Sequence, residues 1–345
     1  MKGGNNMYGF GNILRNYLEY YKISQSDFAD RLGITQKHMN EIINGKTSIS
    51  LELMVVISLL TDIDVNLIYS AEREKETYEK LIKEYNTKSE INKVLNSYGL
   101  KEMKERNWIK LKEQSSFVQN YIDLSDYMNI NSIDNIENYL NKRYLFKTAN
   151  EKLSQSNKIK IFLWVRHCDI LTKGIEIGEY DSNRLNDLLK ELKEERIKKF
   201  DKDRLVKLFH KYGIILCIED ALKGSKVRGC IKVMINTPAI YMTTYYKEKS
   251  SFYYTLYHEL MHLKSDYNKL KSKTMVIEDE KEMDTLALDE MINNDIYKKI
   301  LDNRKDEKNI CKDNKIPLCF LYTRLAYDKI INYNSKEYID NIERI

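Results

Sequence analysis

The chain has 345 residues, enough for two or three domains with their own cores, and 42% hydrophobic with 32% charged residues is typical of a globular protein. No segment approaches the roughly 20 consecutive apolar residues that cross a bilayer, and five scattered cysteines without a Cys-x-x-Cys pair argue against a disulfide framework or a cysteine zinc site. Residues 1–10 lack the layout of a secretory signal, so we expect a cytoplasmic protein without membrane contact. The net charge of +5 permits nucleic-acid binding without requiring it.

The first 72 residues are expected to form a compact domain of short helices. Apolar residues at helical spacing and polar residues at cap positions predict five helices, over residues 11–21, 24–33, 36–43, 50–60 and 66–71. Ser24, Thr35 and Ser50 are expected to cap the second, third and fourth of these helices. Gly33 is expected to end the second helix in a left-handed conformation.

Two short helices joined by a tight turn containing glycine form a helix-turn-helix unit, whose second helix enters the major groove of DNA. The predicted helix over residues 36–43 presents side chains that can bind base edges or phosphates, namely Gln36, Lys37, His38 and Asn40. Residues 1–72 nevertheless carry six basic and eight acidic side chains, a net charge of −2. DNA affinity would then depend on a local basic edge and on dimerisation, and a helical domain used only for protein contacts is the alternative.

Residues 73–200 are expected to form a helical connector. Its first part is charge-dense, as solvated helices usually are, and amphipathic helices follow. Beyond it, β-branched runs predict three strands, over residues 214–218, 228–235 and 239–243, with a turn at 236–238. The predicted fold is therefore mainly α with a C-terminal α+β domain, over residues 201–345, in which a small sheet packs against a helix.

The run His258-Glu-Leu-Met-His262 lies in an apolar, aromatic segment that predicts a buried helix. Two histidines four residues apart lie on one helix face, a spacing that suits two imidazole nitrogens on a single Zn²⁺. Glu259 can then reach a metal-bound water as general base. A core helix with two incidental histidines is the alternative reading.

A catalytic zinc ion usually has three protein ligands and one open position. The other histidines lie in other segments, so a carboxylate from a predicted helix over residues 278–292 is the better third ligand. Glu282 lies beside the apolar face of that helix and can point at the metal. Glu278 and Glu280 are closer to the helix start and are expected to face solvent.

The metal-binding segments resemble the ImmA/IrrE metallopeptidase pattern, in which HExxH is followed by a helix similar to Glu282-Met-Asp-Thr-Leu-Ala287. This resemblance implies a zincin-like α+β domain with His258, His262 and Glu282 as zinc ligands and Glu259 as the base. Met261 and Met283 replace the Gly and Ala of that pattern. In the N-terminal part, residues 23–33 and 41–46 resemble the XRE-type helix-turn-helix, with the HigA-type antitoxin regulators as the closest group.

These features predict a transcriptional regulator that carries a zinc-dependent endopeptidase domain and cleaves a protein regulator. The expected partners are operator DNA, a protein substrate or a toxin or repressor, and a second copy of the chain. In the alternative hypothesis, the protein is a DNA-binding antitoxin or repressor whose metallopeptidase-like domain senses or binds a partner without cutting. Tyr241, Tyr245 and Tyr257 are open choices for the donor that would stabilise the oxyanion.

Overall fold

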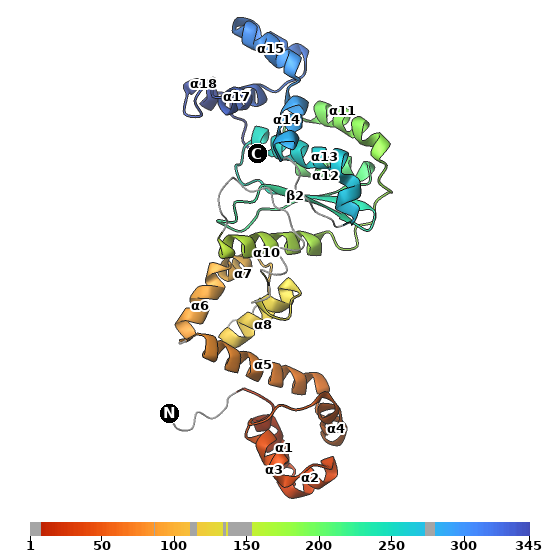
Figure 1. Cartoon of the computed structure of the whole chain (residues 1–345), viewed down its shortest axis with the longest axis vertical. Coiled ribbons are helices and arrows are strands. Elements are labelled where there is room, and N and C mark those ends of the chain that lie inside the picture. Colours follow the sequence, from red (N-terminus) through yellow and green to blue (C-terminus); the bar gives the residue numbers. More distant parts are fainter. Residues whose placement is uncertain (1–7, 86, 111–115, 134–135, 137–153, 273–279) are drawn as a thin grey trace. The chain divides into compact units, whose positions relative to one another are not determined.

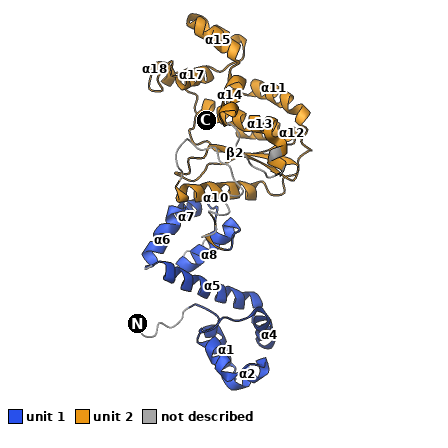
Figure 2. Cartoon of the chain, in the orientation of Figure 1, with its two compact units in different colours: residues 1–131 blue, residues 132–345 orange. Residues whose placement is uncertain are grey.

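The computed structural model describes residues 8–85, 87–110, 116–133, 136, 154–272 and 280–345. The chain divides into two compact units, residues 1–131 and 132–345 (Figure 2). The first unit is helical, and a three-stranded sheet lies in the second, so the predicted fold class is confirmed. The boundary between the units falls inside the expected connector of residues 73–200. The division into three domains therefore stays a prediction.

The first unit begins with five helices: α1 (Gly11–Tyr20), α2 (Gln25–Leu32), α3 (Gln36–Ile43), α4 (Leu51–Thr61) and α5 (Val65–Glu84) (Figure 1). The predicted caps are confirmed, because the side chains of Ser24, Thr35 and Ser50 each accept a backbone N–H three residues further on. Gly33 ends α2 at φ 68°. The buried core of these helices includes Phe10, Leu14, Phe28, Met39, Ile57 and Ile68.

Helix α5 joins two segments that the sequence pattern separates. The expected fifth helix and the start of the charge-dense stretch form one helix of 20 residues, because no glycine or proline interrupts it. Glu72 and Lys75 on this helix are buried. Glu72 accepts the backbone N–H of Phe10 at 3.0 Å, and Lys75 donates to the carbonyl of Thr47 at 3.3 Å. Hydrogen bonds with α5 therefore hold both Phe10, just before α1, and the loop after α3 against this helix.

The rest of the first unit contains α6 (Lys88–Ser97), α7 (Leu100–Glu105) and α8 (Phe117–Met128). Arg73 of α5 donates two hydrogen bonds to the carboxylate of Asp126 at 2.6 and 3.0 Å, which link α5 to the end of α8. The charged residues of α5 therefore make specific contacts within the unit as well as facing solvent.

In the second unit, some helices precede the sheet along the chain and others follow it. Before the sheet come α10 (Gln155–Leu171), α11 (Leu185–Glu195) and α12 (Lys202–Lys211). The sheet consists of β1 (Ile215–Ile218), β2 (Gly229–Met234) and β3 (Thr237–Met242). The helices α13 (Lys249–Ser272) and α14 (Glu280–Met291) follow, and then α15 (Asn294–Asp302), α16 (Glu307–Asp313), α17 (Leu318–Tyr327) and α18 (Lys336–Ile339).

The strand order is β1-β3-β2, with β3 parallel to β1 and antiparallel to β2. All three predicted strands are present within two residues of their expected ends. The turn prediction is wrong at Pro238, which pairs with Val233 inside β3. Pairing of β3 with β1 begins only at Ala239, so the missing proline N–H interrupts no bond to β1. The turn itself falls at Ile235, which has φ 59°, and Asn236.

Helix α13 packs against β2, β3, α14 and α17. Its apolar residues Leu256, Leu260 and Leu263 are buried in one core together with Ile231 and Ile240 of the sheet. Burial of so much apolar surface fixes the rotation of α13 about its axis. The side chains between the apolar ones are thereby directed at α14 and the edge of the sheet.

Candidate metal centre

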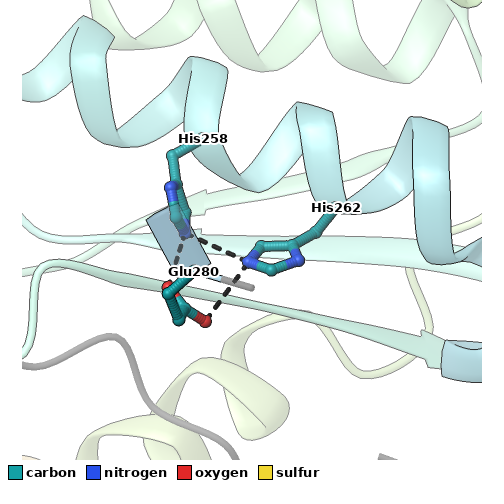
Figure 3. Close-up of side chains that lie close together, drawn as sticks. All are labelled: His258, His262 and Glu280. Carbon is teal, nitrogen blue, oxygen red and sulfur yellow. Dashed lines mark hydrogen bonds and ion pairs between the residues drawn. The ribbon is translucent and has the colours of Figure 1, made fainter. Parts of the chain in front are cut away.

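The two histidines of the HExxH run come together as predicted from their spacing. His258 is fully buried and His262 half-buried on α13. Their Nε2 atoms lie 3.1 Å apart, and the rings stand at 79° to each other (Figure 3). Both imidazoles therefore direct the same nitrogen at one point beside the helix.

The carboxylate of Glu280, at the first residue of α14, completes this group. Its Oε2 lies 3.1 Å from Nε2 of His258, and its Oε1 lies 3.5 Å from Nε2 of His262 (Figure 3). Among the residues that the structure describes, these three offer ligand atoms that all lie within 4.8 Å of one another and could hold a metal ion. Glu280 thus faces the histidines, in contrast to its expected solvent-facing position.

The donor set fits a divalent metal of the zinc type. Zinc–nitrogen bonds of about 2.0–2.1 Å put neighbouring ligands of a tetrahedral site about 3.3–3.4 Å apart. The three separations of 3.1, 3.1 and 3.5 Å bracket that value. Among the residues that the structure describes, no fourth protein ligand joins the two imidazoles and the carboxylate, which is the ligand number of a catalytic zinc site.

Each histidine is oriented by a carboxylate on its other nitrogen. Nδ1 of His258 lies 2.9 Å from Asp284 of α14, and Nδ1 of His262 lies 3.4 Å from Asp266, one turn further along α13. The Tyr254 hydroxyl donates to Asp284 at 2.6 Å. Carboxylates in this position hold the proton on Nδ1 and leave Nε2 as the metal-binding atom.

The electrostatics of the group favour a negative carboxylate beside cationic or metal-bound imidazoles. Hydrogen bonds from His258 and His262 hold the pKa of Glu280 far below its ordinary value. Burial of His262 opposes its protonation, but Glu280, Glu259 and Asp266 outweigh burial and raise the pKa of this histidine.

Glu259 and Glu282 take different places. Glu259 is buried, with 3% of its surface exposed, and its carboxylate lies against the start of β2. Glu282 is exposed on α14 and lies outside the group formed by Glu280 and the histidines. Glu278 lies outside the described residues.

A four-residue period marks the parts of this site that sequence reasoning missed. On α13 the polar side chains Tyr254, His258, His262 and Asp266 follow one another at intervals of one turn. On α14, Glu280 and Asp284 have the same spacing. Side chains four residues apart share a helix face, so this spacing of polar residues was the sequence signal that could have identified Glu280 and Asp284.

The three tyrosines considered as oxyanion donors are engaged or remote. The Tyr241 hydroxyl donates to Asp169 at 2.7 Å, and the Tyr257 hydroxyl accepts from Arg196 at 3.5 Å. Tyr245 is 48% exposed and stacks edge-on with Tyr246. Met261 and Met283 are both buried in the core, so their bulk is accommodated by packing.

In the first unit, the expected DNA-contacting residues lie together on α3. Gln36, Lys37 and Asn40 are exposed, and His38 is half-buried with Nδ1 3.9 Å from Glu41. Arg15 of α1 donates to the carbonyl of Ile43 at 3.2 Å, which fixes the end of α3. The helix therefore presents exposed polar side chains at its N-terminal end.

Comparisons with known proteins agree with this part of the fold. The sequence pattern of a family described as helix-turn-helix matches residues 14–68, which supports DNA binding and transcription regulation. Neither curated proteins nor solved structures give a match. In the described part of the chain, no helix is long and apolar enough to cross a membrane.

Proposed function

We propose that this protein is a DNA-binding transcriptional regulator whose second unit is a zinc-dependent endopeptidase acting on a protein regulator. The observation that carries the proposal is the convergence of three metal-ligand atoms from His258, His262 and Glu280, with a carboxylate behind each histidine. The resemblance of the HExxH segment to the ImmA/IrrE pattern supports the same reaction. The third ligand in this proposal is Glu280 in place of Glu282.

Zinc held by His258, His262 and Glu280 would supply a Lewis acid and would lower the pKa of a bound water to about 7. Glu259, the residue beside the first ligand, would serve as the general base and would return the proton to the leaving amine. Asp284 and Asp266 keep their histidines in the tautomer that binds metal through Nε2. Buried surroundings strengthen each of these charge interactions relative to water.

The peptidase part is tested with Glu259→Gln. This variant is expected to keep its zinc and to lose cleavage by at least about 100-fold, because general-base catalysis contributes 10²–10⁴-fold. Proteomes of cells that express the native protein or Glu259→Gln identify the substrate as a protein that disappears only with the native form. Zinc content of both proteins, with His262→Ala as a metal-free control, shows whether the site is loaded.

Identical proteomes would favour the other hypothesis, a DNA-binding antitoxin or repressor whose second unit binds a toxin or repressor without cutting it. Zinc bound with normal affinity together with unchanged proteomes would assign the metal a structural or sensing role.

The DNA-binding part rests on the match over residues 14–68 and on the exposed polar end of α3. Replacing Gln36 and Asn40 by alanine is expected to weaken operator binding by about 1–3 kcal/mol for each side chain that no longer reaches a base. Asn66→Ala, an exposed position on α5, is the matched control. Genomic footprints of the native protein and of both variants give the comparison, and equal footprints would refute the assignment to α3.

A second copy of the chain is the proposed partner in DNA binding. Helix α4 exposes Leu51, Val55 and Leu59 at 66%, 43% and 76%, a stripe one turn apart on one face. A helix-turn-helix dimer contacts two half-sites and doubles the phosphate contacts of a domain with little positive charge. Leu59→Asp is expected to shift the protein to monomers in analytical ultracentrifugation, and a native monomer at micromolar concentration would refute the idea.

A further inference from the structure

Strand β2 passes α13 so closely at Gly229 that a side chain at this position would have to displace its neighbours. A Cβ atom at this position would lie 2.9 Å from Cγ2 of Thr255 and 3.1 Å from Oε1 of Glu259. It would also lie 3.1 Å from Sδ of Met242 on β3. Gly229 does not have a left-handed backbone, so the neighbouring side chains alone require glycine.

The neighbours differ in how easily they can give way. Thr255 is buried, is branched at Cβ and donates its hydroxyl to the Ser251 carbonyl at 3.1 Å. Met242 is fully buried in the core beneath α13. The carboxylate at the end of Glu259 has three side-chain torsions behind it and can swing away at the least cost. An added methyl group would approach Thr255 most closely, and the Glu259 carboxylate is the neighbour that it would displace most easily.

We propose that Gly229 is a positioning residue for the general base: the bare backbone of β2 forms the wall against which the Glu259 carboxylate rests. A side chain at residue 229 would move that carboxylate from the position in which it could act as the general base. The role of Gly229 in catalysis rests on the proposed peptidase function. The packing of Glu259 against residue 229 does not depend on that function and can be tested without it.

The contact is tested by melting temperatures at a fixed zinc concentration. Overpacking at Gly229→Ala is expected to lower the melting temperature by about 2–10 °C. In a Glu259→Ala background the same change is expected to lower the melting temperature by less, because the carboxylate is absent and only the contacts with Thr255 and Met242 remain. Gly178→Ala, in the same unit with no atom within 4 Å of the added methyl, is the matched control and is expected to change nothing.

A second background separates the two side chains that meet the methyl group. If Thr255→Ser removes the whole cost of Gly229→Ala and Glu259→Ala removes none, the carboxylate does not rest on β2 and the proposal is overturned. If Gly229→Ala fails to fold alone, folding restored by Glu259→Ala supports the proposal, and failure in both backgrounds refutes it.

The catalytic consequence is measured with fluorescein-labelled casein as probe. Gly229→Ala is expected to lower kcat at least about tenfold with KM and zinc content unchanged, whereas Gly178→Ala keeps native kcat. Native kcat in Gly229→Ala would overturn the positioning role even where the melting temperatures show contact. If the native protein cuts no casein, a zinc-loaded crystal structure of Gly229→Ala decides instead, since an unmoved Glu259 carboxylate would refute the proposal.

Discussion

The choice between Glu280 and Glu282 as third metal ligand gives a sharp prediction. Glu280→Gln keeps the size of the side chain but removes the charge that lies 3.1 and 3.5 Å from the two Nε2 atoms. Four-ligand zinc sites bind with about 10–16 kcal/mol, or about 2.5–4 kcal/mol for each ligand. An amide oxygen retains part of this, so we expect zinc affinity to fall about 100-fold.

Glu282→Gln removes the same charge from the same helix at an exposed position two residues away. Its zinc affinity is expected to stay within about twofold of native, because an exposed charge is screened by solvent. Competition with a chromophoric chelator at fixed pH and ionic strength measures both dissociation constants. A large loss in Glu282→Gln with native affinity in Glu280→Gln would refute the geometry and restore Glu282 as ligand.

Three further predictions follow from the contacts of named side chains. Asp284→Asn is expected to weaken zinc binding about 10–100-fold, measured in the same competition, because a neutral amide oxygen accepts the Nδ1 proton of His258 more weakly than the carboxylate does. In metal-free protein, the raised pKa of His262 stabilises the fold below its ordinary value of 6.5, and the lowered pKa of Glu280 does so above 4.5. The melting temperature in chelator should therefore peak between these pH values and fall on either side, and Glu280→Gln should flatten the peak. Lys75→Ala should destabilise the first unit by about 3–5 kcal/mol in urea unfolding, because it leaves the Glu72 carboxylate buried without its cation, and a loss under 1 kcal/mol would contradict this.

Local sequence patterns were enough to predict the helices and strands and two ligands of the candidate metal centre. Ser24, Thr35 and Ser50 lie directly before apolar periodic runs, so side-chain capping decided where three helices start. The spacing of His258 and His262 likewise decided that their rings share a face, because one helical turn separates them. Such features depend on residues within about one turn of each other.

Local patterns could not predict the contacts between segments that lie far apart in the sequence. The sequence could not show that α5 continues through residue 72, since the buried pair of Glu72 and Lys75 gains its partners only from Phe10 and Thr47. Pro238 likewise suggested a turn, and only the pairing of β1 from Ala239 onward explains how a strand tolerates it. In both cases the local preference was outweighed by tertiary packing.

The candidate metal centre likewise has one part that the sequence predicts and one part that depends on tertiary packing. The sequence by itself determined the helix that carries His258, Glu259 and His262, because a four-residue spacing is a property of any helix. Only the tertiary structure decided that Glu280 faces the histidines while Glu282 is exposed, since this depends on the rotation of α14 against α13. That rotation is set by burial of apolar side chains such as Ala287 and Met291, which no spacing within one helix specifies.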